Sequence, residues 1–213
     1  MLATIILTAE TIGVIAFAVS GALLAVEKNF DIFGIMVLGL LTAFGGGVVR
    51  DLLLGLVPPV FFSSYTMAGL AVLASLAVFL LYRFGGDMRL LSGRDITAIV
   101  NFFDAIGLGI FAVTGVNMAL EHSFADNPLL CITVGTLTGI GGGIIRDIMA
   151  GEVPSVLRKN VYALAAILGA ACYYCLMILG IGILPSVLAA AGLTVALRLL
   201  ATYFHWHLPR PRS

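Results

Sequence analysis

The sequence predicts an all-α integral membrane protein with seven transmembrane helices, arranged as two inverted three-helix repeats followed by a seventh helix. Of the 213 residues, 61% are hydrophobic and 10% are charged, whereas ordinary soluble domains carry about 25% charged residues. Apolar stretches of about 18 or more residues recur along the chain, which is typical of helical spans and not of membrane β-strands. Two sequence blocks also occur twice in the same order.

Apolar runs separated by charged residues, glycine and proline predict the individual helices, each long enough for a hydrocarbon core of about 30 Å. Pro58, Pro59 and Pro154 end the second and fifth helices, and Pro128 opens the fifth, where proline in a first turn is tolerated. The expected helices span residues 5–26, 32–56, 64–84, 96–120, 128–150, 160–180 and 184–204.

A seventeen-residue pattern occurs twice inside these apolar runs. The first copy reads GGGVVRDLLLGLVPPVF from Gly45, and the second reads GGGIIRDIMAGEVPSVL from Gly141, with nine of seventeen positions identical. Upstream of it, ETIGVIAFAVSGALLAVE (Glu10–Glu27) matches DAIGLGIFAVTGVNMALE (Asp104–Glu121). Two aligned blocks in the same order indicate an internal duplication.

The duplication divides the chain into three parts. Residues 1–93 form the first repeat, residues 94–182 form the second, and residues 183–213 form the seventh helix and a cytoplasmic tail. Each repeat holds three helices, an odd number, so the second repeat enters the membrane from the opposite side. Such inverted repeats are typical of transporters and some channels, where the pathway lies at the repeat interface near the midplane.

The charges in the loops predict the orientation. One side carries Glu121, His122 and Asp126 but no clear lysine or arginine. In the cell's inner membrane, the positive-inside rule then places the N-terminus outside and the C-terminus in the cytoplasm. A net charge of zero and the absence of a basic face argue against nucleic acid as a partner. The basic residues that fall together on the opposite side are Lys28, Arg83, Arg89, Arg94, Arg158, Lys159, Arg210 and Arg212.

Three consecutive glycines weaken the second and fifth helices, because each glycine in a helix costs about 1 kcal/mol relative to alanine. We expect both helices to break or kink there, freeing carbonyl groups that are good ligands for cations. The alternative is close packing, since small residues let helix backbones approach. The matched Thr42 and Thr138 either offer hydroxyls to a permeant ion or bond to their own helix. The glycines are Gly45, Gly46, Gly47, Gly141, Gly142 and Gly143.

Each glycine motif also carries an arginine–aspartate pair at membrane depth. An arginine at a helix centre costs about 2.5–3.5 kcal/mol on the insertion scale, so partners are expected. Neighbouring residues point about 100° apart on a helix. We therefore expect pairing across the repeats, Arg50 with Asp147 and Arg146 with Asp51.

Glu10 and Asp104 are the alternative partners of these arginines. We interpret the charged set as a clasp between the repeats that also acts as a gate, and lining of the pathway is the alternative. Arg198, in the seventh helix, has no counterpart in the duplication and is expected to reach the cytoplasmic face or to pair between subunits.

The doubled GGGxxRD motif, the three-plus-three-plus-one layout and the length resemble the prokaryotic branch of the trimeric intracellular cation (TRIC) channels, a family also described as a UPF0126-like or glycine-transporter-type duplicated membrane domain. The resemblance implies a homotrimer with one pore per subunit, selective for monovalent cations such as potassium, between the kinked second and fifth helices. It places the two glycine triplets at the kinks. It also places Arg50, Asp51, Arg146 and Asp147 beside the pathway.

The predicted function is therefore a potassium-permeable cation channel, and the alternative is a secondary transporter for a small amino acid such as glycine. The sequence holds no Ser–His, paired-carboxylate or HExxH arrangement, which argues against an enzyme. We expect no cofactor or metal site beyond the permeant monovalent cation. The expected partners are membrane lipid and further copies of the chain.

Overall fold

The computed structural model describes residues 2–85, 93–158, 161–204 and 206, and the regular structure among them is helical, with no strand. Seven of their helices are long and apolar enough to cross a membrane, which confirms the predicted class. The predicted bounds differ from the observed ones by at most three residues. The seven are α1 (Leu2–Glu27), α2 (Ile32–Leu53), α3 (Tyr65–Phe84), α4 (Gly93–Glu121), α5 (Pro128–Met149), α7 (Val161–Ile178) and α8 (Ile183–Tyr203).

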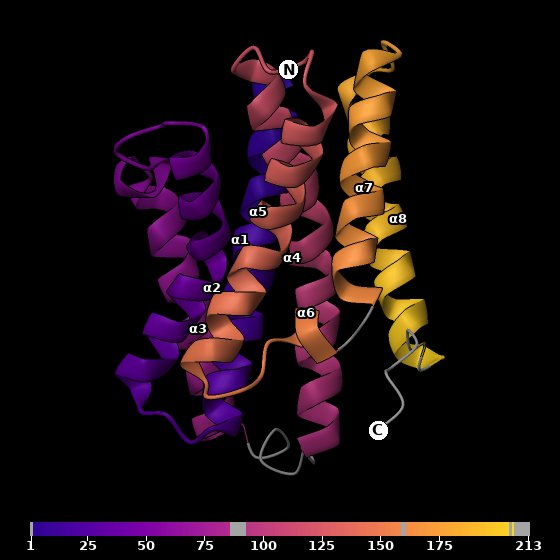
Figure 1. Cartoon of the computed structure of the whole chain (residues 1–213). Coiled ribbons are helices and arrows are strands. Elements are labelled where there is room, and N and C mark those ends of the chain that lie inside the picture. Colours follow the sequence, from indigo (N-terminus) through magenta and orange to yellow (C-terminus); the bar gives the residue numbers. More distant parts are fainter. Residues whose placement is uncertain (1, 86–92, 159–160, 205, 207–213) are drawn as a thin grey trace.

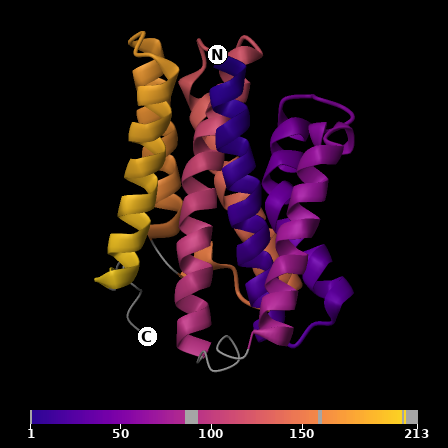
Figure 2. The same cartoon turned by 180° about the vertical axis from the view of Figure 1, so that it is seen from behind.

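The helices form one bundle in which α1 packs against α4 and α2 packs against α5 (Figures 1 and 2). In Figure 1, α1 and α3 run downward while α2 runs upward, and α4, α5 and α7 take the opposite directions. The two helix triplets therefore run antiparallel to each other, as an odd number of spans in each half requires. Whether residues 1–93 and 94–182 are repeats of one ancestor stays a prediction.

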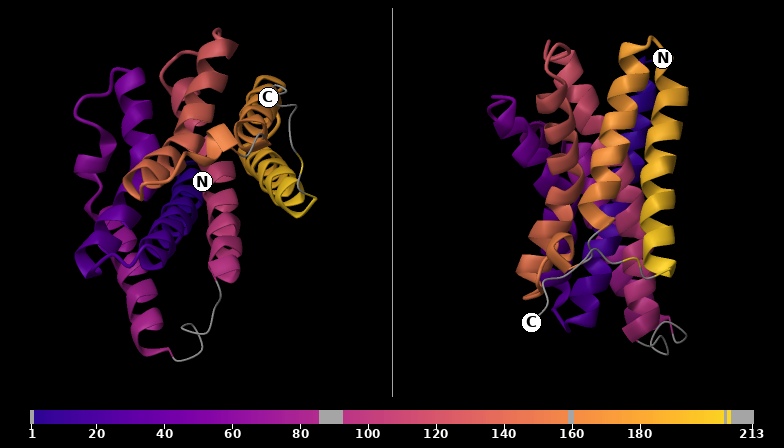
Figure 3. Two further views of the ribbon diagram at one scale, coloured as in Figure 1. Left: turned by 60° about the horizontal axis from the view of Figure 1, so that its bottom comes forward. Right: turned by 45° about the vertical axis from the view of Figure 1, so that its right-hand side comes forward.

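The outer helices cover the flanks of this central packing. Figure 3 shows α7 and α8 side by side on one flank, with α3 on the other. The seventh span, α8, packs against α4 and α7 and belongs to neither triplet.

The predicted tail beyond α8 lies outside the described residues except for Trp206, and so do four of the basic residues used to predict the orientation. These four are Arg89, Lys159, Arg210 and Arg212.

Helices α2 and α5 begin and end in the same way. Asp31 and Asn127 cap their first turns, each accepting a hydrogen bond from a backbone N–H three residues later. Gly55 and Gly151 follow their last turns with φ angles of 73° and 72°, a left-handed conformation that favours glycine. The chain then turns into two short helices that the sequence did not predict, η1 (Val60–Ser63) and α6 (Ser155–Arg158).

The glycine triplets lie where α2 and α5 pack together, and both helices continue through them without a break. A Cβ atom at Gly46 would lie 2.0 Å from the Thr138 carbonyl oxygen, and one at Gly142 would lie 2.2 Å from that of Thr42. The predicted break is therefore wrong, because the glycines serve the alternative role of close backbone packing. A kink within these continuous helices stays a prediction.

This contact predicts that alanine at either position disrupts the bundle. We expect Gly46→Ala and Gly142→Ala each to destabilise the protein by about 1–3 kcal/mol, because the added methyl group has no room. Thermal unfolding of the purified protein in detergent measures the effect. Gly69→Ala in α3 is the matched control, since a Cβ atom there meets nothing within 4 Å. Equal melting temperatures for all three variants would contradict the close packing.

Candidate functional site

The first charged group lies near the upper end of α2 as drawn in Figure 1, and we call Glu10, Arg50 and Asp51 the Arg50 cluster. The Nε atom of Arg50 donates to Asp51 Oδ1 at 2.8 Å. Its Nη1 atom lies 3.7 Å from Glu10 Oε1, an ion pair too long for a hydrogen bond. Arg50 and Asp51 are buried, while the Glu10 side chain is 27% exposed.

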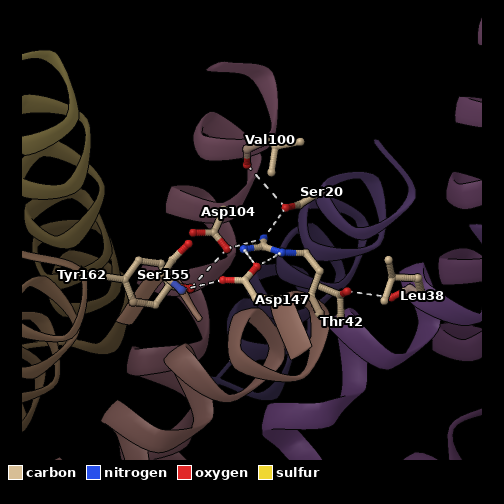
Figure 4. A network of polar contacts seen from close by, with 9 residues as sticks. Ser20, Leu38, Thr42, Val100, Asp104, Asp147, Ser155 and Tyr162 are labelled. Carbon is tan, nitrogen blue, oxygen red and sulfur yellow. Dashed lines mark hydrogen bonds and ion pairs between the residues drawn. The ribbon is translucent and has the colours of Figure 1, made fainter. Parts of the chain in front are cut away.

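The second group lies near the lower end of α5 and is more completely bonded (Figure 4). Nη1 of Arg146 donates to Asp104 Oδ1 and to Ser20 Oγ, both at 2.6 Å. Its Nε and Nη2 atoms donate to Asp147 Oδ1 at 2.9 and 2.7 Å. The Tyr162 hydroxyl donates to Asp104 Oδ1 at 3.2 Å. We call these five buried residues the Arg146 cluster.

The predicted cross-pairing of Arg50 with Asp147 and of Arg146 with Asp51 is wrong. Each arginine binds the aspartate that follows it, because the long side chain curls back along its own helix. The alternative partners, Glu10 and Asp104, are confirmed. A link between the triplets still exists, but it runs from Arg146 on α5 to the Ser20 hydroxyl on α1.

The aspartates also hold the short helices that follow. Asp51 Oδ2 accepts the backbone N–H of Val60 at 2.8 Å, and Asp147 Oδ2 accepts that of Ser155 at 2.6 Å. Each carboxylate thus joins an arginine to the first residue of η1 or α6. The bonded N–H lies nine residues after Asp51 and eight after Asp147, because Pro59, which stands at the position of Ser155 in the first copy, has no N–H to donate.

The hydroxyl groups of the matched threonines donate to backbone carbonyls of their own helices. Thr42 Oγ1 donates to the Leu38 carbonyl, and Thr138 Oγ1 donates to that of Val134, both at 2.6 Å. This is the alternative that the sequence left open. Both side chains are fully buried, so a role as ion ligands stays a prediction.

Each charged cluster faces a cavity that is large enough for water, whose share of liquid volume is about 30 Å³. The Arg50 cavity has a volume of about 80 Å³ and the Arg146 cavity about 220 Å³. The first is lined by Glu10, Val14, Arg50, Asp51, Phe111 and Met118, among others. The second is lined by Lys28, Thr97, Asn101, Arg146, Asp147 and Glu152, among others.

A pair of stacked phenylalanines lies close to the α2–α5 crossing. The rings of Phe17 on α1 and Phe111 on α4 stack with their centroids 5.2 Å apart. Phe17 lies against Gly142 at the helix crossing, and Phe111 lines the Arg50 cavity. The sequence analysis did not name them as site residues, although both occupy the same place in the duplicated block.

Tyr162 and Arg198 extend the Arg146 cluster toward α8. The Arg198 guanidinium lies over the Tyr162 ring, 4.8 Å from its centroid, an attractive cation–π geometry. Arg198 is only 2% exposed, so the expectation that it reaches the cytoplasmic face is wrong. Its contact helps to orient the tyrosine that hydrogen-bonds Asp104.

A family model described as "Glycine transporter" matches residues 7–83 and 101–177. The chain belongs to this family. The UPF0126 membrane protein YvgT of Bacillus subtilis is 38% identical, with coverage of 94% of this chain and 93% of that protein. The UPF0126 inner membrane protein YadS of Escherichia coli is 35% identical, with coverage of 95% and 93%.

Solved structures in the family are prokaryotic TRIC channels, which confirms the predicted family. One of them has a TM-score of 0.86 at 34% identity, with coverage of 96% of this chain and 99% of that one. The trimeric intracellular cation channel orthologue from Rhodobacter sphaeroides has a TM-score of 0.85 at 31% identity, with coverage of 95% and 100%. These neighbours are channels and not enzymes, which agrees with the prediction that the protein is not an enzyme.

The unequal bonding of the two arginines predicts unequal costs of removing them. Arg146→Gln leaves Asp104 and Asp147 buried without their cation, so we expect a loss of about 3–5 kcal/mol. Arg50→Gln should cost less, because Glu10 is partly solvated and not hydrogen-bonded to Arg50. Thermal unfolding in detergent measures both. A larger loss for Arg50→Gln would contradict the observed bonding.

Proposed function

We propose that this protein is a passive, potassium-permeable cation channel with one pore per subunit, running between α2 and α5. The observation that carries the proposal is the pair of charged cavities. They approach the α2–α5 crossing from opposite ends, and each is walled by one Arg–Asp pair. Support also comes from the solved structures, because two of the similar proteins are named cation channels.

The charges in the cavities suit transient cation binding. The Arg146 cavity is lined by the carboxylates of Glu27, Asp147 and Glu152 and by the cations Lys28 and Arg146. Asp147 and Glu152 attract a further cation only weakly, since Arg146 and Lys28 already pair with them. Conduction requires such weak sites, because an ion that binds tightly does not leave.

We infer that the pathway is closed in the described conformation. The stacked Phe17 and Phe111 rings present an apolar barrier near the crossing, and apolar constrictions stop ions by excluding water. The Arg146–Ser20 hydrogen bond adds a polar bridge between the triplets at the edge of the Arg146 cavity. Opening therefore requires the two rings to leave the pathway and the close α2–α5 contact at Gly46 and Gly142 to loosen.

We propose a homotrimer in the inner membrane, with the N-terminus outside and the C-terminus in the cytoplasm. The names of relatives support this, since YadS is an inner membrane protein and a solved neighbour is a trimeric channel. Lys28 follows α1 and Arg83 lies in the last turn of α3, and both helices end on the lower side in Figure 1. The positive-inside rule makes that side cytoplasmic.

Purified protein in planar bilayers tests the channel directly. Stepwise unitary potassium currents are the expected result, and their absence from correctly assembled protein would contradict the proposal. Light scattering in detergent checks the subunit count on the same sample.

The alternative is a secondary transporter for glycine, which the family description favours. The Arg50 cluster suits such a ligand, because a guanidinium and a partly exposed carboxylate lie together beside a small cavity. Saturable glycine counterflow in proteoliposomes, without unitary currents, would establish this alternative.

The aromatic barrier predicts a gain of conductance when it is removed. Phe17→Ala and Phe111→Ala should each raise the open probability several-fold, because water enters the space that the ring vacates. Single-channel recording measures this. Phe102→Ala on the same helix as Phe111 is the control, since that ring is 46% exposed. Unchanged gating in both barrier variants would exclude the phenylalanines from the pathway.

The Lys28–Glu152 ion pair at the Arg146 cavity predicts a salt-dependent effect on conductance. The hydrogen bond to Glu152 raises the pKa of Lys28. The lysine therefore stays cationic to a higher pH than an ordinary lysine does. Lys28→Gln should raise potassium conductance at low ionic strength and have little effect near 1 M salt, where charges are screened. Equal effects at both ionic strengths would contradict an electrostatic role.

A further inference from the structure

One buried hydroxyl in the described part of the chain has no partner. Thr114 on α4 is 1% exposed, and its Oγ1 atom makes no hydrogen bond. Other buried threonines behave differently, because Thr42, Thr138 and Thr194 donate to the carbonyl four residues earlier. Leaving a buried polar group unpaired costs free energy, so an orphan of this kind needs an explanation.

The duplicated block gives Thr114 a counterpart that does have a partner. Ser20 stands at the same position of the first copy, and its Oγ accepts the hydrogen bond from Arg146 Nη1 at 2.6 Å. That bond joins α1 to α5. The equivalent pair of helices, α4 and α2, is also in contact. The arginine of α2 that corresponds to Arg146 is Arg50.

Arg50 is the side chain that lacks this contact. Its described hydrogen bond uses Nε alone, and its Nη1 atom stands 3.7 Å from Glu10. Phe111 and Met118 line the cavity that contains Arg50, and Thr114 lies three and four residues from them on the same helix face. The orphan hydroxyl therefore lies on the face of α4 that supplies two residues to the wall of the Arg50 cavity.

We propose that Thr114 is the docking residue for the Arg50 guanidinium in a second conformation, as Ser20 is for Arg146 in this one. The inference rests on the proposed pathway between α2 and α5. Ser20 and Thr114 are positioning residues: each hydroxyl holds an arginine of the opposite triplet and so fixes how the triplets sit together. In the described conformation, the Ser20 contact is made and the Thr114 contact is open.

The two contacts stabilise different conformations, which gives them opposite mutational effects. Ser20→Ala removes a bond of the described conformation and favours the second. Thr114→Val removes a bond of the second conformation only and leaves every described contact in place. Removing a hydrogen bond to a charged group changes the ratio of the two conformations by about tenfold or more.

A spin-label distance between α2 and α4 measures this ratio without requiring transport. Labels at Leu53→Cys and His122→Cys, which are both exposed, report how the upper ends of these helices are placed. The full-length protein is used in detergent and in lipid, with labelled subunits diluted by unlabelled ones. The native cysteines replaced by alanine are Cys131, Cys172 and Cys175.

The expected result is a shift of the distance populations in opposite directions for Ser20→Ala and Thr114→Val. Ser20→Thr and Thr114→Ser keep the hydroxyl and should match the parent, and Thr194→Val is the control for a buried threonine bonded within α8. A shift in the same direction, or no shift for Thr114→Val, would overturn the proposal. If Ser20→Ala fails to fold, Thr114→Val against Thr114→Ser still decides it.

Potassium currents separate this inference from the proposed function. Opposite distance shifts in a protein without currents would leave the docking inference standing and remove the channel. Normal currents with no effect of Thr114→Val on distance or open probability would leave the channel standing and remove the docking residue.

Discussion

The approach of two helix backbones at Gly46 and Gly142 sets the rest of the arrangement. A methyl group at either position would meet a carbonyl oxygen of the opposing helix at 2.0 or 2.2 Å, so α2 and α5 touch main chain to main chain. That contact leaves no room for a side-chain layer between them. The charged residues one turn later on each helix must then lie on opposite sides of the crossing, each facing its own cavity.

Burying charge at these places is stable only where each ion has a full set of partners. Arg146 has them, because two carboxylates and a hydroxyl surround its guanidinium. Arg50 has one carboxylate at hydrogen-bonding distance and a second that is partly solvated. The two halves thus carry the same motif, but only its second arginine has a full set of bonded partners. This difference suits a protein with more than one conformation.

The seven spans followed from the sequence because apolar length alone decides whether a helix crosses a membrane. The residues of the site also followed, since arginine and aspartate at membrane depth are rare and the duplication marks them twice. Their partners did not follow. Helical geometry argued against Arg146 binding Asp147, but the flexible arginine side chain overcomes the angle between adjacent positions. Ser20 and Tyr162 carry no signal of their own, because a small hydroxyl residue and an aromatic in a span usually serve packing.

Asp147 ties the interior of the bundle to its surface. One carboxylate oxygen holds the buried guanidinium of Arg146, and the other holds the main chain of Ser155. Between them the chain passes through Glu152, which pairs with Lys28 beyond the end of α1. A displacement of the buried arginine therefore also displaces a segment of main chain that water can reach. Conversely, a molecule that binds this segment from outside changes the position of the arginine.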